Sequence, residues 1–381
     1  MFDMHLAGKR GNLIAIVDVG SGSVGLTYAM VRRGMPASVM AAERVVLSPE
    51  ERSKEATITK LAEGLDEAAK KIRQTKIPTA NEVYCIVHAP WTRSRSVSAS
   101  SHFEKEKVIT DSIIGALAQQ ALGSETELDR SNILEASVVR IELNGYPAGE
   151  PVGKSARDIA LYALLSDCDA DVRAGMQPSL QRTFAHLTPI FRSSTRALLT
   201  VLRERPRDGD DYLIVDVGSE ATNLVVVRGG VVSAQRLVSE GMRSMLARIA
   251  PTGMQEETLN LVRMLESDEC SSGACQTIQE SMARAEPEMV RVFGEGMAAS
   301  ATSKKLPNRL LLLAHPDMSV WLSRFFARID FTQFTQTTQP FVIQTLSAKE
   351  LENFVIAEKG VVLDTGLAIS AALVNIEKSR A

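Results

Sequence analysis

Short apolar runs at the start of the chain predict a meander of strands. Residues 13–18 (LIAIVD) are apolar and end in an acid, and after the turn Val-Gly-Ser-Gly-Ser a second apolar run covers residues 24–31. This order predicts strand, tight turn and strand. Residues 38–47 alternate weakly between two prolines and predict a third strand. In residues 57–72 the apolar positions recur at helical spacing, which predicts an amphipathic helix.

The next block has a different pattern and predicts an inserted module. Residues 82–89 are rich in β-branched and aromatic residues, as strands are. After a segment rich in Ser and Arg, Thr110 or Asp111 is suited to cap a helix. Two further strands are predicted around the hairpin signal Asn144-Gly145. The order strand, helix, strand, strand predicts a small α+β module at residues 83–165.

The second half of the chain repeats the pattern of the first. After two predicted helices, a charged turn at residues 205–211 is a candidate boundary between two lobes. Residues 212–216 (YLIVD) then open a second meander, which continues to residue 237. The elements predicted after it are a largely helical, polar stretch at 240–300, a buried strand at 309–314, a helix at 319–326 and a terminal helix within 360–375.

The internal repeat suits phosphate binding. Residues 13–34 and 212–232 each contain an apolar strand, Asp-Val-Gly-Ser, a polar turn, a second strand and a glycine turn. Glycines let backbone N–H groups approach an anion, hydroxyls add donors, and an acid at the strand end can hold hydrated Mg²⁺. The alternative is a duplicated hairpin without a ligand. The candidate phosphate-binding residues are Gly20, Ser21, Gly22, Ser23, Gly218, Ser219 and Thr222, and the candidate Mg²⁺-holding acids are Asp18 and Asp216.

Length and charge narrow the class of protein. A chain of 381 residues favours two or more domains. The net charge of −3 gives no bias toward nucleic acid. The cysteines and histidines lack the spacing of a zinc site, and no apolar run reaches the roughly 18 residues that span a bilayer. We therefore expect a cytosolic α/β protein with no nucleic-acid partner and no direct membrane insertion.

The paired turns and the inserted block resemble the actin, Hsp70 and sugar-kinase superfamily, and within it the FtsA/PilM branch. The resemblance implies a two-lobed α/β protein of the actin-like (ribonuclease H-like) ATPase fold with an inserted α+β subdomain of the SHS2 type. It implies ATP and Mg²⁺ as ligands of the two turns. The implied domains are a first lobe of residues 1–82 and 166–210, the insertion at 83–165, and a second lobe of residues 211–381 with a helical part at about 245–305.

Departures from the family pattern predict weakened nucleotide binding. Where the family has a glycine-rich turn beside the base, this chain has Ala-His-Pro-Asp-Met, in which Pro316 fixes φ and removes a donor. Glu220 takes a position where glycine is common, and its carboxylate would repel phosphate unless Mg²⁺ or outward rotation intervenes. No water-activating residue is identified in residues 192–200 (RSSTRALLT). We expect at most a weak ATPase, with no catalytic residue assigned.

The end of the chain favours the PilM type over the FtsA type. FtsA-like proteins end in a linker and a basic amphipathic helix that lies on the membrane, whereas residues 367–381 are better explained as a last core helix. PilM-like proteins are cytosolic, bind ATP and dock the cytoplasmic tail of an inner-membrane partner during assembly of a type IV pilus or related secretion machine. The alternatives are an FtsA-like division protein, a self-associating, filament-forming actin homologue, and a pseudo-ATPase scaffold without nucleotide.

The resemblance places docking in a groove between the first lobe and the inserted module, where an apolar peptide segment would be buried. Trp91, Arg93 and Arg95 are the candidate partner-binding residues, because exposed aromatics with Arg are common interface anchors. The alternative is that Trp91 belongs to the core and the Ser/Arg stretch is a solvated loop.

Overall fold

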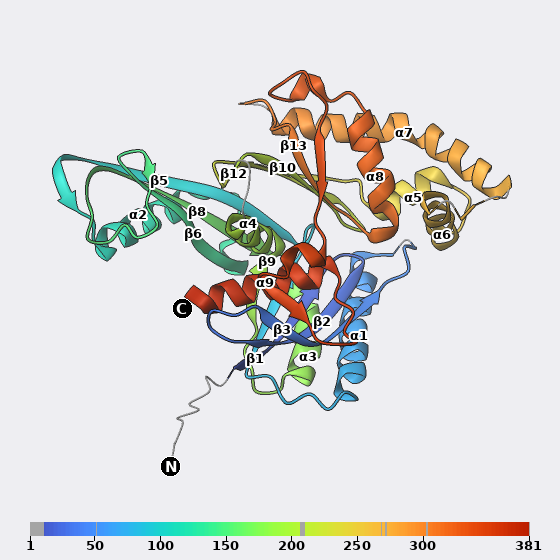
Figure 1. Cartoon of the computed structure of the whole chain (residues 1–381), viewed down its shortest axis with the longest axis horizontal. Helices are drawn as coiled ribbons and strands as arrows, with labels where there is room; N and C mark the ends of the chain where they lie inside the picture. The colour runs from blue at the N-terminus through green and yellow to red at the C-terminus, as the bar shows by residue number, and fades with distance from the viewer. Residues whose placement is uncertain are drawn as a thin grey trace, which may run out of the picture.

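The computed structural model describes residues 11–50, 52–205, 210–267, 269–270, 273–301 and 304–380. These residues form two lobes and a module that projects from the first lobe, each built on one sheet (Figure 1). The predicted architecture, a two-lobed α/β fold with a small inserted α+β module, is confirmed. Part of the charged turn proposed as a lobe boundary, residues 206–209, lies outside the described residues.

The sheet of the first lobe is buried on both faces. On β1 (Asn12–Val19), Ala15 and Val17 pack against helices α1 (Lys54–Arg73) and α3 (Ala170–Thr183), while Ile14 and Ile16 pack against α4 (Ser194–Glu204) and α9 (Thr365–Arg380). A strand covered on both faces has no polar side, which explains the continuous apolar run. In spatial order the strands are β15 (Val355–Ala357), β3 (Ala37–Val46), β2 (Ser23–Val31), β1 (Asn12–Val19), β4 (Glu82–Val87) and β9 (Ile190–Ser193).

The last segment of the chain belongs to the first lobe, which corrects the expectation that residues 211–381 form the second. β15 pairs in parallel with β3, with Val355 opposite Ala37. Residues 367–376 of α9 are all buried, as expected for a helix that is apolar on nearly every side. The same core also contains Ile214 and Val225 of the second lobe. Helices α4 and α9 therefore form a layer shared by both lobes.

The inserted module has the predicted order of strand, helix, strand and strand, but it lies at residues 92–168 rather than 83–165. The preceding strand β4 is excluded because it pairs with β1 and β9 in the first lobe. The Ser/Arg-rich segment forms the start of a long strand, and Thr110 caps the helix as predicted. The elements are β5 (Thr92–Val108), α2 (Asp111–Ser124), η1 (Arg130–Asn132), β6 (Ile133–Leu143), β7 (Tyr146–Pro147) and β8 (Ser155–Cys168), with strand order β5-β8-β6-β7.

The second lobe repeats the start of the first. Strand β10 pairs antiparallel with β11 and parallel with β13, as β1 does with β2 and β4. In spatial order its strands are β12 (Val231–Val238), β11 (Thr222–Arg228), β10 (Tyr212–Val217), β13 (Arg309–Leu313) and β14 (Val342–Thr345). Between β12 and β15 the chain also forms the helical elements α5 (Met242–Ile249), α6 (Gln255–Glu266), α7 (Gly273–Ser300), α8 (Pro316–Arg328), η2 (Thr332–Phe334) and η3 (Ala348–Leu351). Among the described helices, none combines the length and the apolar character needed to cross a membrane.

Candidate functional site

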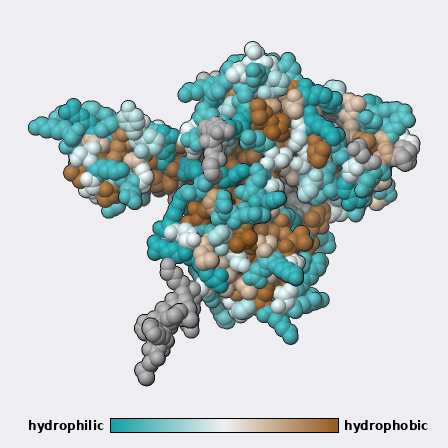
Figure 2. All heavy atoms as spheres, in the orientation of Figure 1, coloured by the Kyte–Doolittle hydropathy of each residue, from teal (hydrophilic) through white to brown (hydrophobic). Residues whose placement is uncertain are grey.

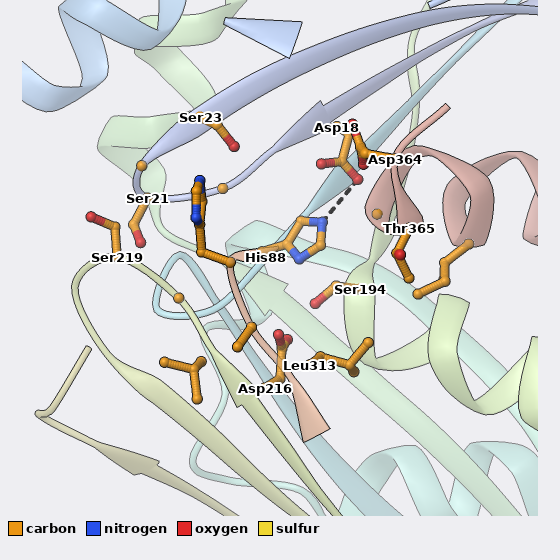
Figure 3. Close-up of a pocket in the computed structure, with 18 of the residues that line it drawn as sticks. Asp18, Ser21, Ser23, His88, Ser194, Asp216, Ser219, Leu313, Asp364 and Thr365 are labelled. Carbon is orange, nitrogen blue, oxygen red and sulfur yellow. Dashed lines mark hydrogen bonds and ion pairs between the residues drawn. The ribbon is translucent and has the colours of Figure 1, made fainter. Parts of the chain in front are cut away.

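The two repeated turns lie side by side and together line one side of a cavity between the lobes (Figure 3). The first turn joins β1 to β2 and the second joins β10 to β11, so both follow strands that have a parallel neighbour. The carboxyl ends of such strands are where α/β folds place ligand sites. The cavity has a volume of about 480 Å³. Among the predicted residues, it is lined by Asp18, Gly20, Ser21, Gly22, Ser23, Asp216, Gly218 and Ser219.

The two turns are in direct contact. A Cβ placed on Gly22 would lie 2.5 Å from the Cβ of Ser219, so this approach requires a glycine. Across the same contact, the backbone N–H of Glu220 donates to the Ser21 hydroxyl oxygen at 3.2 Å. A side-chain hydroxyl of the first turn thus accepts a hydrogen bond from a backbone N–H of the second turn.

Each turn is closed by the same internal hydrogen bond. The Gly20 N–H donates to the Ser23 carbonyl at 3.0 Å, and the Gly218 N–H donates to the Ala221 carbonyl at 2.9 Å. The repeat in sequence is therefore also a repeat in backbone geometry.

Two residues of the second turn are directed away from the cavity. Thr222 is buried, and its hydroxyl donates to the Glu240 carbonyl at 2.6 Å, so it supports the chain behind the turn and does not line the cavity as predicted. Glu220 forms an ion pair of 2.6 Å with Arg243 at the start of α5. This ion pair removes the repulsion of phosphate that the sequence suggested for Glu220.

Asp18 is buried, and both of its carboxylate oxygens have protein partners. Oδ1 accepts from Arg44 Nη2 at 3.1 Å, while Oδ2 accepts from Ser370 Oγ at 2.7 Å and lies 2.9 Å from His88 Nε2. Burial raises the pKa of Asp18, but the charges of His88 and Arg44 outweigh burial and hold the pKa well below its ordinary value. Asp18 is therefore a stable carboxylate that has protein partners on both of its oxygens.

His88 is a site residue that the sequence reasoning missed. It follows β4, and Figure 3 shows it pointing at Asp18 from the same end of the sheet. Burial lowers the pKa of His88, but Asp18 and, more weakly, Asp216 outweigh burial and raise it. The position of a histidine directly after a strand parallel to β1 was the signal that could have identified it.

The two acids of the repeat are not equivalent. Burial raises the pKa of Asp216; His88 lowers it, while the charge of Asp18 adds to the rise, and the net pKa is raised. Asp18, by contrast, is held in its charged form. The sequence repeat thus carries one anionic acid and one that is pushed toward protonation.

Arg44, on β3, is a second residue that the sequence reasoning missed. Its Nε and Nη2 atoms donate to Asp364 at 2.7 and 3.1 Å, and its Nη1 atom donates to Ser23 Oγ at 2.9 Å. Burial lowers the pKa of Arg44, but Asp18 and Asp364 outweigh burial and raise it above its ordinary value. No sequence signal links Arg44 to Asp364, because the two lie 320 positions apart.

The other side of the cavity is largely apolar and ends in the proline turn. Leu312 and Leu313 at the end of β13 line it, together with His315 and Pro316. Pro316 occupies the first turn of α8, where its missing N–H costs no hydrogen bond, and His315 Nδ1 accepts from the Asp317 N–H at 3.3 Å. The turn that replaces the family's glycines is therefore a capped helix start.

The predicted partner-binding residues separate into two kinds. Trp91 is only 7% exposed and packs in the core that contains α1 and α3, which is the alternative that the sequence left open for it. Arg93 and Arg95 lie on β5 with much of each side chain exposed, and they form ion pairs with Asp167 and Glu127. Of these three residues, only the two arginines therefore have side chains that another molecule could contact.

The cavity fits a nucleotide better than it fits a metal ion. Its glycine turns and hydroxyls suit a phosphate group, which a bound nucleotide would supply, and its apolar side suits a base. Mg²⁺ demands near-octahedral oxygen ligands, but the oxygens of Asp18 are engaged by Arg44, His88 and Ser370. In the described part of the chain, no cluster of three or more His, Cys, Asp or Glu residues is arranged to hold a metal ion. Direct coordination of Mg²⁺ by Asp18 would therefore compete with these partners, whereas the hydrated Mg²⁺ that the sequence predicts stays a prediction.

Comparison with known proteins identifies the fold. No protein-family model and no curated protein sequence matches the chain. The structure is similar to that of the PilM–PilN type IV pilus biogenesis complex, with a TM-score of 0.58 and 15% identity over 94% of this chain and 97% of that chain. It also matches the ethanolamine utilization protein EutJ from Carboxydothermus hydrogenoformans, with a TM-score of 0.44 and 10% identity over 95% and 88% of the two chains. The chain has the actin-like ATPase fold.

Proposed function

We propose that this protein is an actin-like scaffold of the PilM type. In this proposal it binds an adenine nucleotide in the cavity between its lobes and docks the cytoplasmic tail of an inner-membrane protein of a type IV pilus or related secretion machine. It works in the cytoplasm and reaches the membrane through that partner. Its nucleotide supports conformation and docking, and turnover is at most slow.

The observation that carries the proposal is the likeness to the PilM–PilN complex, because it extends over 94% of this chain and 97% of the other. The shared length includes the inserted module, so the similarity is not confined to the two lobes. The relative was solved with a partner, PilN. A protein built in the same way throughout is a reasonable candidate for a similar docking role.

The attachment of the module supports a docking role. Glu135 on β6 is buried, and it accepts from the Ser193 backbone N–H at 3.0 Å and from its hydroxyl at 2.6 Å. The other oxygen of Glu135 lies 3.3 Å from Arg196 on α4, which in turn pairs with Glu377 on α9 at 2.5 Å. These contacts fix the module to the first lobe, and a preformed surface lowers the entropy cost of binding.

We place the docking surface where β5 leaves the first lobe, beside Arg93 and Arg95. Figure 2 shows apolar side chains on the module and on both lobes, between larger polar areas. Exposed apolar residues of this kind suit a peptide that has an apolar segment. Of those on the module, Val138 pairs with Ala163 in the middle of its sheet, whereas Val108, Tyr146 and Val152 lie toward the end away from Arg93 and Arg95.

The test is a binding titration of the full chain with synthetic amino-terminal tails of pilus inner-membrane proteins. We expect one tail to bind, and the double substitution Arg93→Ala with Arg95→Ala to weaken it about tenfold or more. Arg182→Ala is the matched control, because Arg182 is an exposed arginine that pairs with Asp66 away from the module. If no tail is retained, the docking role is wrong.

Two further measurements separate the alternatives. Calorimetry with ATP tests the nucleotide part of the proposal, and the absence of any heat or thermal shift would favour a scaffold without nucleotide. Pelleting of the protein with anionic lipid vesicles in the absence of a partner would favour an FtsA-like protein that binds the membrane directly.

A further inference from the structure

The guanidinium of Arg44 is held in a fixed position beside the first phosphate turn. Its three nitrogen atoms are hydrogen-bonded to Asp18, Asp364 and Ser23, at distances between 2.7 and 3.1 Å. A planar guanidinium that engages two carboxylates at once has a more strictly fixed orientation than a guanidinium in a single ion pair. The side chain nevertheless lines the cavity.

Two glycines make room for this guanidinium. A Cβ on Gly25 would lie 3.3 Å from Cζ of Arg44, and a Cβ on Gly366 would lie 3.1 Å from its Nη2 atom. Gly25 lies opposite Arg44 in the β2–β3 pairing, and Gly366 is in the first turn of α9. Glycines of β2 and α9 therefore leave space beside Arg44, and a Cβ on Gly25 would also lie 2.7 Å from Leu367 Cδ2.

Arg44 already supplies a cation to Asp18. Its Nη2 atom donates to Oδ1, while Ser370 and His88 contact Oδ2. A divalent ion that bound Asp18 directly would lie close to the positive charge of Arg44, which disfavours it. A positive charge beside Asp18 and Asp364 is thus already present as a side chain.

We propose that Arg44 replaces the divalent cation in this pocket, so that the pocket binds a nucleotide without Mg²⁺. The identity of the ligand rests on the proposed function, whereas the replacement of the cation rests only on the geometry of Arg44. Arg44 balances the charge of Asp18 and holds the hydroxyl of Ser23, which belongs to the first turn, in a fixed place.

The first test measures the affinity of the full chain for ATP by calorimetry, once with excess Mg²⁺ and once with EDTA. We expect the two dissociation constants to agree within about threefold. If EDTA weakens binding by about tenfold or more, Mg²⁺ is part of the site and the proposal is overturned.

The second test uses Mn²⁺ alone as a spectroscopic probe, so it does not depend on nucleotide binding. We expect no Mn²⁺ signal from the pocket of the unmodified chain, and a bound Mn²⁺ in Arg44→Gln, because Asp364 and Oδ1 of Asp18 then lose their cationic partner. Arg182→Gln is the control, since it removes an exposed guanidinium far from Asp18. Bound Mn²⁺ in the unmodified pocket, or none in a folded Arg44→Gln chain, contradicts the proposal.

Failure of the proposed function and failure of this inference give different results. If ATP does not bind under either condition, the nucleotide part of the function is wrong, and the Mn²⁺ experiment still decides the role of Arg44. If Arg44→Gln does not fold, the unmodified chain still shows whether Mn²⁺ binds in the pocket. Arg44→Lys, which keeps the positive charge, should then behave like the unmodified chain and bind no Mn²⁺.

Discussion

The hydroxyl oxygen of Ser21 lies 3.2 Å from the backbone nitrogen of Glu220, and this hydrogen bond joins the two lobes at their phosphate turns. The two residues are separated by 199 positions in the chain, and each belongs to one copy of the internal repeat. Beside them, Gly22 and Ser219 are in contact. The closed arrangement of the lobes therefore depends on small residues at this point.

The contact between Gly22 and Ser219 predicts the effect of a single methyl group. In Gly22→Ala the new Cβ would lie 2.5 Å from the Cβ of Ser219, so the turns must move apart. We expect a loss of about 1–3 kcal/mol in the free energy of unfolding, the usual cost of overpacking. Urea denaturation followed by circular dichroism measures this loss.

Two companion variants separate the contact from a general effect of removing a glycine. Gly115→Ala lies in α2, where an added Cβ meets nothing within 4 Å, and it should leave stability unchanged or raise it by about 1 kcal/mol. The double variant Gly22→Ala with Ser219→Gly removes the opposing Cβ and should recover most of the loss. A double variant as unstable as Gly22→Ala would show that the contact is not the cause.

The pair of His88 and Asp18 predicts a dependence of stability on pH. The pKa of His88 is raised from 6.5, so its charged form stabilises the fold fully below pH 6.5, and this contribution is lost as the pH rises through the pKa of the folded state. The pKa of Asp18 is lowered from 3.8, so its contribution is present above pH 3.8 and is lost only in stronger acid.

We therefore expect His88→Gln to destabilise the protein by about 1–3 kcal/mol at mildly acidic pH, the range for a hydrogen bond to a charged group, and by less in alkaline buffer. Denaturant titrations of both proteins across this pH range give the difference directly. His186→Gln, at an exposed position, is the control. A difference that stays constant or grows with pH would mean that His88 is not charged in the folded protein.

The position of α9 between the lobes predicts a large effect at Leu373. This side chain is fully buried in the shared core, so Leu373→Ala should cost about 2–5 kcal/mol by leaving a cavity. Val362, just before the helix, is 87% exposed, and Val362→Ala should be nearly neutral. Thermal unfolding of the two variants compares them. Similar melting temperatures would contradict the assignment of α9 to the core.

How far the sequence predicts the fold depends on the range of the interactions. The repeat at residues 13–34 and 212–232 was predictable, because strand periodicity and glycine turns are local signals, and the actin-like fold was expected from the resemblance that the repeat and the inserted block carry. The pairing of β15 with β3 was not predictable, because a strand of three residues carries little pattern and its partner is far away in the chain. The Asp and Gly residues of the two turns were predicted to serve one phosphate site, and they line the same cavity, whereas Arg44 and Asp364 meet only through the tertiary fold.

The layer formed by α4 and α9 also decides how the molecule can move. Its core packs against strands of both lobes, so the lobes cannot separate there without exposing apolar side chains to water. The turns on the opposite side of the cavity are joined, among the described residues, by the hydrogen bond between Ser21 and Glu220 and by the close approach of Gly22 to Ser219. We expect opening to be a rotation about α4 and α9 as an axis, with the widest displacement at Ser21 and Glu220. A ligand at the turns would then bind far from the rotation axis, where a given force produces the largest torque on the angle between the lobes.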